Sequence, residues 1–269
     1  MLQVSKVKQK MKEGQTVIRA FLRFPNPGAA EIMVLSGVDL VVLDQEHYPF
    51  NAQEIEAIVR AAQSFGGECM VRVPNTEPAR IAQVMESGVC GVVVPHIETY
   101  EEAMEVVNAV KYAPIGKRGF CPITRAATYG MGMNAKEYAA FANEQTSIIL
   151  MTETKRGLEN LDEILTIPQV DGISIGPSDV SASFGMPGQV DHPMVQAAIR
   201  EGEKKILAAG KVLAAQAYDG TAAKRAYDRG ARILTVGSDV QVLTKGFARL
   251  TQTMYGVERE FFEGQEAQK

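Results

Sequence analysis

The sequence predicts an α/β fold, a (β/α)8 barrel in which eight parallel strands alternate with helices. Eight short apolar runs rich in β-branched residues recur along nearly the whole chain, with amphipathic segments between them. The runs are continuously hydrophobic, which is typical of parallel strands that are covered on both faces. A length of 269 residues suits one barrel of this kind. No GxGxxG motif follows the first strand, which disfavours a doubly wound open sheet.

The predicted strands follow the chain in order. They are residues 17–22, 38–44, 69–73, 90–95, 147–153, 170–176, 211–217 and 232–237. Helical patterns such as residues 51–66 and 77–88 lie between them. Several of the helical segments end on a glycine, namely Gly37, Gly66, Gly88, Gly210 and Gly230. Glycine just past a helix readily adopts the left-handed conformation that ends it, so these residues mark the returns to the next strand.

The chain shows no linker and no break in composition, so we expect a single domain over residues 1–269. It comprises an N-terminal helix at 1–14, a barrel at about 15–255 and a C-terminal tail at 256–269. The N-terminal segment is too polar for a signal peptide, and no apolar stretch approaches the roughly 20 residues that span a bilayer. We therefore expect a cytoplasmic protein.

Composition argues against several classes of partner. The net charge is −4 and the isoelectric point about 5.6, which gives no reason to expect nucleic acid or an anionic membrane. Cys69, Cys90 and Cys121 are widely spaced and match no metal-ligand pattern, so they are expected to be small buried hydrophobes in a reducing compartment. Phe261–Phe262 in the tail suits either a frayed end or docking on another subunit.

Polar side chains gather where predicted strands end, which is where barrel enzymes place their chemistry. Asp44, Glu46 and His47 follow the second strand, and His96 follows the fourth. His47 fits either a packing role or proton transfer. Arg72, a charge inside an apolar strand, must meet an anion, either in a structural salt bridge or as a substrate carboxylate.

Two carboxylates on consecutive strands suggest a metal site. Glu153 ends the fifth predicted strand and Asp179 follows the sixth. Together they bring hard oxygen ligands that suit Mg²⁺ or Mn²⁺. Taken singly, Glu153 fits an ion pair with a nearby cation and Asp179 fits a helix cap. The pair at adjacent strand ends favours the metal.

The loop at residues 174–188 is predicted to bind an anion. Gly176 and Pro177 form a tight turn, and Ser178 begins a helix whose free N–H groups suit an anionic oxygen. A plain turn with an N-cap uses the same residues. Arg118 and Arg125 lie in a long loop before the fifth strand. No predicted strand carries a lysine in its interior or at its C-terminal end, which disfavours Schiff-base catalysis.

These motifs, taken together, resemble the HpcH/HpaI aldolase family from about residue 15 to residue 250. The resemblance rests on LDQEHYPF, VRVPNTEP, VVVPHIET, GKRGF, TETKRGLENLDEI and DGISIGPSDVSASFGMPG. The family comprises class II pyruvate aldolases, typified by 4-hydroxy-2-oxoheptanedioate aldolase. It implies cleavage of a 4-hydroxy-2-oxo acid to pyruvate and an aldehyde through a metal-bound pyruvate enolate. It also implies a homo-oligomer, a hexamer in preference to a trimer, with the last helix exchanged between neighbouring barrels.

The resemblance implies a role for each matching residue. Glu153 and Asp179 would bind the divalent metal (Mg²⁺, Mn²⁺ or Co²⁺), and Arg72 would hold the keto oxygen. The backbone around Gly176, Pro177 and Ser178 would receive the substrate carboxylate. His47 would transfer protons through metal-bound water, with Glu86 of a neighbouring subunit as its partner.

The chain departs from the family pattern at three places. Met151 stands where the family has Gln, Glu86 where the type member has Asp, and the chain has no Trp on its first strand. Two other functions therefore stay open. One is a related metal–enolate lyase, acting on a β-hydroxyacyl-CoA or on oxaloacetate. The other is a catalytically lapsed barrel that binds a 2-oxo acid.

Overall fold

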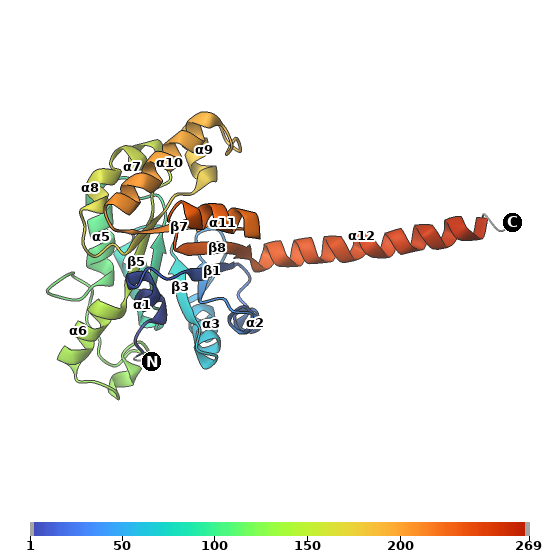
Figure 1. Cartoon of the computed structure of the whole chain (residues 1–269). Coiled ribbons are helices and arrows are strands. Elements are labelled where there is room, and N and C mark those ends of the chain that lie inside the picture. Colours follow the sequence, from blue (N-terminus) through green and yellow to red (C-terminus); the bar gives the residue numbers. More distant parts are fainter. Residues whose placement is uncertain (1–2, 267–269) are drawn as a thin grey trace.

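Eight parallel strands form a closed barrel in the computed structural model, each paired with the next and β8 with β1 (Figure 1). The structure describes the backbone of residues 3–266 and the side chains of residues 3–257. The strands are β1 (Val17–Leu22), β2 (Leu40–Asp44), β3 (Glu68–Arg72), β4 (Gly91–Val94), β5 (Ser147–Met151), β6 (Gly172–Ser174), β7 (Val212–Gln216) and β8 (Ile233–Ser238). The predicted barrel is confirmed, and each observed strand lies within one residue of its predicted range.

Helices surround the barrel and return the chain to the start of each next strand (Figure 1). They are α1 (Lys6–Lys12), α2 (Pro27–Leu35), α3 (Ala52–Ser64), α4 (Pro78–Glu86), α5 (Tyr100–Val110), the 3-10 turn η1 (Thr128–Gly130), α6 (Ala135–Gln145), α7 (Lys155–Glu159), α8 (Leu161–Leu165), α9 (Pro177–Ser183), α10 (Pro193–Ala208), α11 (Gly220–Asp228) and α12 (Asp239–Glu266). The five glycines predicted to end helices all have φ between 70° and 102°. A side chain would be strained there, so glycine sets these boundaries.

Two apolar layers build the core. Residues such as Val42, Met70 and Ile149 fill the barrel interior, and a larger cluster packs between the sheet and the helices. Successive residues of a strand point to opposite faces. The alternation that turns Leu40 and Val42 inward therefore also turns Asp44 inward at the end of β2. Strand geometry thus delivers polar side chains to the mouth of the barrel.

The C-terminal segment is helical as far as the structure describes it. Residues 256–266 of the expected tail belong to α12, a continuous helix of 28 residues that projects from the barrel (Figure 1). The side chains of Phe261 and Phe262 lie outside those that the structure describes. Among the described residues, no helix is long and apolar enough to cross a membrane.

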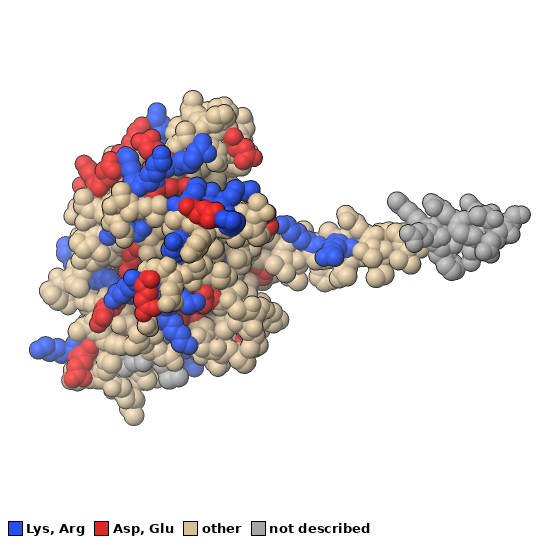
Figure 2. Space-filling view, in the orientation of Figure 1, with Lys and Arg blue, Asp and Glu red and all other residues tan. Residues whose placement is uncertain are grey.

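Charged side chains of both signs are interspersed over the barrel face shown in Figure 2, while much of the described part of α12 is uncharged. One stripe of α12 is apolar, with residues spaced alternately by four and three: Leu243, Phe247, Leu250, Met254 and Val257. Each of these side chains is between 47% and 64% exposed. This spacing places them on one face of a helix, so α12 presents an uncovered apolar surface.

Candidate active site

Arg72 is anchored at the barrel mouth by Asp44. Its Nε donates to Asp44 Oδ1 at 3.1 Å and its Nη2 to Oδ2 at 2.7 Å, and Asp44 is fully buried. Arg23 Nε donates to the same Oδ2 at 3.3 Å. A bidentate pair of this kind fixes the plane of the guanidinium. The structural salt bridge foreseen for Arg72 is therefore present, and it orients the guanidinium in the cavity at the mouth.

Glu46 and His96 join this group from the neighbouring strand ends. Glu46 Oε2 lies 2.9 Å from Arg72 Nη1, and Glu46 Oε1 lies 3.1 Å from His96 Nε2. On its other side, His96 Nδ1 lies 3.6 Å from Glu153 Oε1, which also accepts a hydrogen bond from the His96 backbone N–H at 3.1 Å. His96 has a φ of 55°, a left-handed conformation uncommon for residues other than glycine. The turn after β4 thus places an imidazole between two carboxylates.

Glu153 is a buried carboxylate with an incomplete set of partners. It is 1% exposed, and its Oε2 has no hydrogen-bond partner among the described side chains and backbone. Burial first, and then the charge of Asp179, raise the pKa of Glu153 from 4.5 to about 7. A Cβ placed on Gly176 would lie 2.3 Å from Glu153 Oε2 and 3.4 Å from Asp179 Oδ2. Both carboxylates therefore converge on Gly176, whose lack of a side chain leaves them room.

These donors fit a divalent cation. Ligand atoms of Glu46, His96 and Glu153 lie within 4.8 Å of one another, and Asp179 adds a fourth donor next to Glu153. The unpaired Oε2 of Glu153 is an orphaned ligand atom in a buried place. Three carboxylates and an imidazole match the ligand preferences of Mn²⁺ and Co²⁺, and the carboxylates alone suit Mg²⁺.

The predicted anion loop begins α9. Gly176 is the N-cap of this helix and Pro177 its first residue, without a side-chain cap. Proline has no N–H, so the free amides at the start of this helix are those of Gly176, Ser178 and Asp179. The loop lies beside Glu153, because Gly176 adjoins that carboxylate.

His47 lies at the rim of the mouth. Its side chain is 58% exposed, and its Nε2 is 3.7 Å from Glu46 Oε2. Its backbone N–H donates to Asp44 Oδ1 at 3.4 Å. The imidazole is thus accessible to solvent and to a ligand while staying next to the buried carboxylates.

Glu86 is not brought to this group within the chain. It is the last residue of α4, which returns to the N-terminal end of β4, so it lies at the opposite end of the barrel from the mouth. Arg118 and Arg125 also lie away from the mouth. Arg118 is buried over the Tyr112 ring at 4.6 Å, and Arg125 donates to Ser87 O and Gln63 Oε1. Within the chain, neither arginine offers a basic groove at the mouth.

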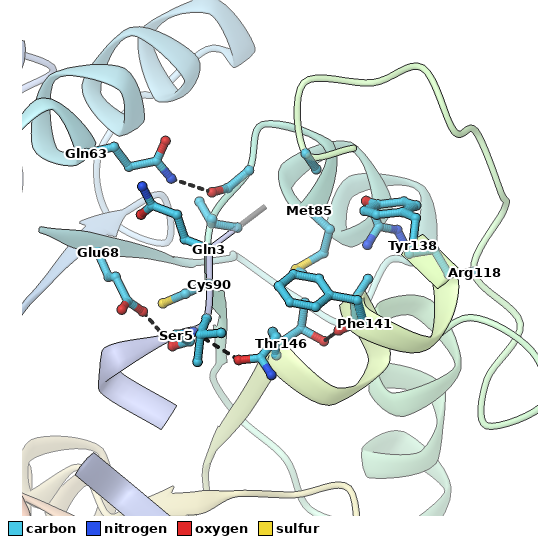
Figure 3. A pocket seen from close by; sticks show the side chains of 16 residues that line it. Gln3, Ser5, Gln63, Glu68, Met85, Cys90, Arg118, Tyr138, Phe141 and Thr146 are labelled. Carbon is cyan, nitrogen blue, oxygen red and sulfur yellow. Dashed lines mark hydrogen bonds between the residues drawn. The ribbon is translucent and has the colours of Figure 1, made fainter. Parts of the chain in front are cut away.

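Two cavities mark the two ends of the barrel. One of about 90 Å³ lies at the mouth, and no lysine is among its described lining residues. The other, of about 70 Å³, contains Glu68 and Cys90 and is shown in Figure 3. Glu68 begins β3 and Cys90 precedes β4, so this second pocket is at the N-terminal end of the barrel. Chemistry in such barrels occurs at the C-terminal end, which assigns the candidate site to the mouth.

The mouth contains two charged residues that sequence reasoning missed. Arg19 and Arg23, both on the first strand or just after it, line the same cavity as Arg72. The signal that singled out Arg72, a charge within an apolar strand, was also present for Arg19 in VIRAFL. Glu46 and His96 were noticed at strand ends, but their contact with Glu153 depends on how the strands close.

Known proteins are similar to this chain in sequence and in fold. A family profile described as HpcH/HpaI aldolase/citrate lyase matches residues 18–245. A 2-keto-3-deoxy-L-rhamnonate aldolase of Klebsiella pneumoniae is 35% identical over 90% of each chain. A pyruvate aldolase of Rhizobium etli is 34% identical over 91% of this chain and 95% of its own. The crystal structure of an HpcH/HpaI aldolase/citrate lyase family protein from Burkholderia cenocepacia superposes with a TM-score of 0.88 at 29% identity, covering 93% of this chain and 99% of the other.

Proposed function

The chain belongs to the HpcH/HpaI aldolase/citrate lyase family, and from this premise we propose that it cleaves a 4-hydroxy-2-oxo acid to pyruvate and an aldehyde. The same site would catalyse the reverse aldol addition. The relatives are named aldolases, so the chain is an enzyme of the carbon–carbon lyase class. One observation carries the proposal: the carboxylates of Glu153 and Asp179 meet beside Gly176 at the mouth that also holds the Arg72 guanidinium.

Glu153 and Asp179 are the proposed ligands of a divalent metal, Mg²⁺, Mn²⁺ or Co²⁺, with Glu46 and His96 close enough to assist. The orphaned Oε2 of Glu153 supports this assignment. When bound, the ion supplies a Lewis acid that stabilises negative charge developing on the substrate oxygens.

Arg72 has the proposed role of stabilising the oxygen that becomes negative when the carbon–carbon bond breaks. Its bidentate contact with Asp44 holds the guanidinium before the reaction begins. A donor that is already oriented needs no reorganisation as charge develops, which is the main way in which enzymes stabilise such oxygens. The amides of Gly176 and Ser178 are the proposed receptors of the substrate carboxylate.

Proton transfer is assigned to His47. Cleavage removes the proton of the 4-hydroxyl, and the pyruvate enolate must then gain a proton at its methylene carbon. The exposed imidazole at the rim has the accessibility for the first of these steps. Glu86 of a neighbouring subunit is its proposed partner, since Glu86 cannot reach the mouth of its own barrel.

Removal of the metal is expected to abolish formation of the enolate. Exchange of the pyruvate methyl protons with D₂O, followed by NMR, reports this step without any aldehyde. We expect no exchange in chelator-treated enzyme and recovery when Mg²⁺, Mn²⁺ or Co²⁺ is restored. An enzyme that shows no exchange with any divalent ion would exclude the aldolase assignment.

A homo-oligomer, hexameric or trimeric, is proposed as the active form. The apolar stripe of α12 is exposed, and so is apolar surface on the barrel wall, where Val236 of β8 is 40% exposed and Ile32 and Leu35 of α2 are 67% and 66% exposed. Exposed apolar surface of this extent favours association. Exchange of α12 between neighbouring barrels would cover both surfaces.

Two inactive variants are expected to restore each other if the site is shared between subunits. His47→Ala and Glu86→Gln should each lose aldol cleavage, and co-expression should return up to about a quarter of the sites, because random assembly places both native residues together at that frequency. Light scattering of both variants would establish equal assembly. If the mixed oligomer regains no activity, then either His47 and Glu86 act within one subunit or neither of them takes part in the reaction.

A further inference from the structure

The cavity at the mouth has two chemically different sides. One side carries Arg72 and Gly176, to which the proposed function assigns the 2-oxo acid. The other side is built by β7, β8 and β1, and its polar residues include Gln216, Thr235 and Arg19. This second side is left for the part of the substrate that becomes the aldehyde.

Arg19 is the only one of the three arginines in this cavity that has no carboxylate partner among the residues with described side chains. Arg23 and Arg72 both pair with Asp44. The Nε and Nη2 of Arg19 donate to Thr235 Oγ1 at 2.9 and 2.7 Å, and its Nη1 has no partner within the described part of the chain. The side chain is only 3% exposed. Arg19 is therefore a buried cation that lines the cavity and has one donor, Nη1, without a hydrogen-bond partner among the described residues.

The surroundings of Arg19 do not neutralise its charge. Its guanidinium lies 5.4 Å from the Phe21 ring, and the Arg72 guanidinium lies 4.9 Å from the same ring. Burial, followed by the positive charge of Arg72, lowers the pKa of Arg19 to about 10, so the group stays charged at neutral pH. A buried charge without a counter-ion is costly, and residues that break such rules are concentrated at functional sites.

We propose that Arg19, supported by Thr235 and Gln216, binds a second carboxylate at the far end of the substrate, so that the aldehyde released is itself an acid. This inference rests on the proposed function for the identity of the reaction, but the subsite stands on its own geometry. A planar guanidinium matches a carboxylate, and Arg19 lines the same cavity of about 90 Å³ as Arg72.

Matched aldehydes test the subsite in the direction of aldol addition to pyruvate. Glyoxylate and glycolaldehyde have the same length, and only the first carries a carboxylate. In Arg19→Met, kcat/KM for glyoxylate should fall about 10- to 100-fold, the loss expected for one charged hydrogen-bonded pair, while glycolaldehyde changes little. Arg19→Lys should keep part of the preference for glyoxylate over glycolaldehyde. Arg200→Met, an exposed arginine of α10, is the matched control.

Three other measurements separate the proposed subsite from two alternatives, in which Arg19 binds the 2-oxo acid or only stabilises the fold. Pyruvate proton exchange should keep its KM in Arg19→Met, and a large increase would assign Arg19 to the 2-oxo acid and overturn the proposal. The thermal midpoint of the unliganded variant should stay equal or rise, because an uncompensated charge is removed. The affinity for succinate, measured by calorimetry, should weaken at least about tenfold in Arg19→Met. This measurement requires no catalytic turnover.

The outcomes distinguish a failed subsite from a failed function. Absence of proton exchange in the wild type would contradict the aldolase function, and succinate binding would still decide the subsite. Equal succinate affinity in wild type and Arg19→Met, or equal losses with glyoxylate and glycolaldehyde, would overturn the role of Arg19. A large loss of stability without a change in succinate binding would make Arg19 a structural residue.

Discussion

Replacing Glu153 by Gln is expected to reduce pyruvate proton exchange by at least about a hundredfold, the scale of loss seen when a key electrostatic group is removed. The substitution keeps the shape of the side chain but removes the charge that would hold the metal next to Asp179. Exchange measured by NMR at saturating Mn²⁺ checks this. Glu159→Gln on α7 is the control, because that carboxylate is 63% exposed and its ion pair with Lys155 is long, at 3.9 Å.

The same variant is expected to change how stability depends on pH. In the metal-free protein the pKa of Glu153 is about 7, whereas its ordinary value is 4.5. The folded protein therefore retains a proton that the unfolded chain loses, and the free energy of unfolding should fall as the pH rises from about 4.5 to about 7. The full difference is about 3 kcal/mol. Glu153→Gln should lack this decline, which chemical denaturation across the window would measure.

Metal binding should follow the opposite trend. A cation needs the ionised carboxylate, so affinity for Mn²⁺ should increase as the pH rises through about 7. Equal Mn²⁺ affinity in wild type and Glu153→Gln would show that Glu153 is not a metal ligand. A parallel decline of their unfolding free energies between pH 4.5 and 7 would show that the buried carboxylate does not have the raised pKa.

Replacing Arg72 by Met is expected to damage both stability and activity. It leaves the fully buried Asp44 with the 3.3 Å contact to Arg23 as its one remaining cation and the 3.4 Å hydrogen bond from the His47 backbone N–H, and breaking one side of a buried ion pair costs about 3–5 kcal/mol. Loss of a preoriented donor should also lower the rate of pyruvate exchange about a hundredfold or more. Urea denaturation and NMR exchange measure the two effects.

A second substitution separates these effects. Arg72→Met combined with Asp44→Asn removes both charges, so most of the stability should return while the activity stays low. Arg60→Met is the matched control, because Arg60 pairs with Glu56 at the surface, where such pairs contribute less than about 1 kcal/mol. Recovery of activity in the double variant would mean that Arg72 serves only to neutralise Asp44.

Much of the site could be predicted from strand ends alone. Arg72, Glu153 and the turn at Gly176 each lie at or just beyond the end of a strand, and a closed parallel barrel brings all such ends to one mouth. Burial of Arg72 beside a carboxylate followed from the cost of an unpaired charge in an apolar strand. The partner of Arg72 was not predictable, because Asp44 and Glu46 were equally near in sequence and both contact it.

Other features required the tertiary structure. The contact of His96 with both Glu46 and Glu153 depends on the left-handed turn after β4, which no glycine marks. The Arg19–Thr235 pair joins residues 216 positions apart through closure of β1 on β8. The projecting course of α12 also required the structure, because its apolar stripe packs on none of the described residues of its own chain.

The sequence by itself determined the fold class and the strand ends, because hydrophobic periodicity and glycine positions act locally along the chain. Only the tertiary structure decided which charges meet and which one lacks a counter-ion. Pairing depends on distances of a few ångströms between separate strands, and these distances are set by the register of the closed barrel. Glu153, with a free ligand atom, and Arg19, with a free donor, are two of the buried side chains with a polar atom that has no hydrogen-bond partner among the described residues.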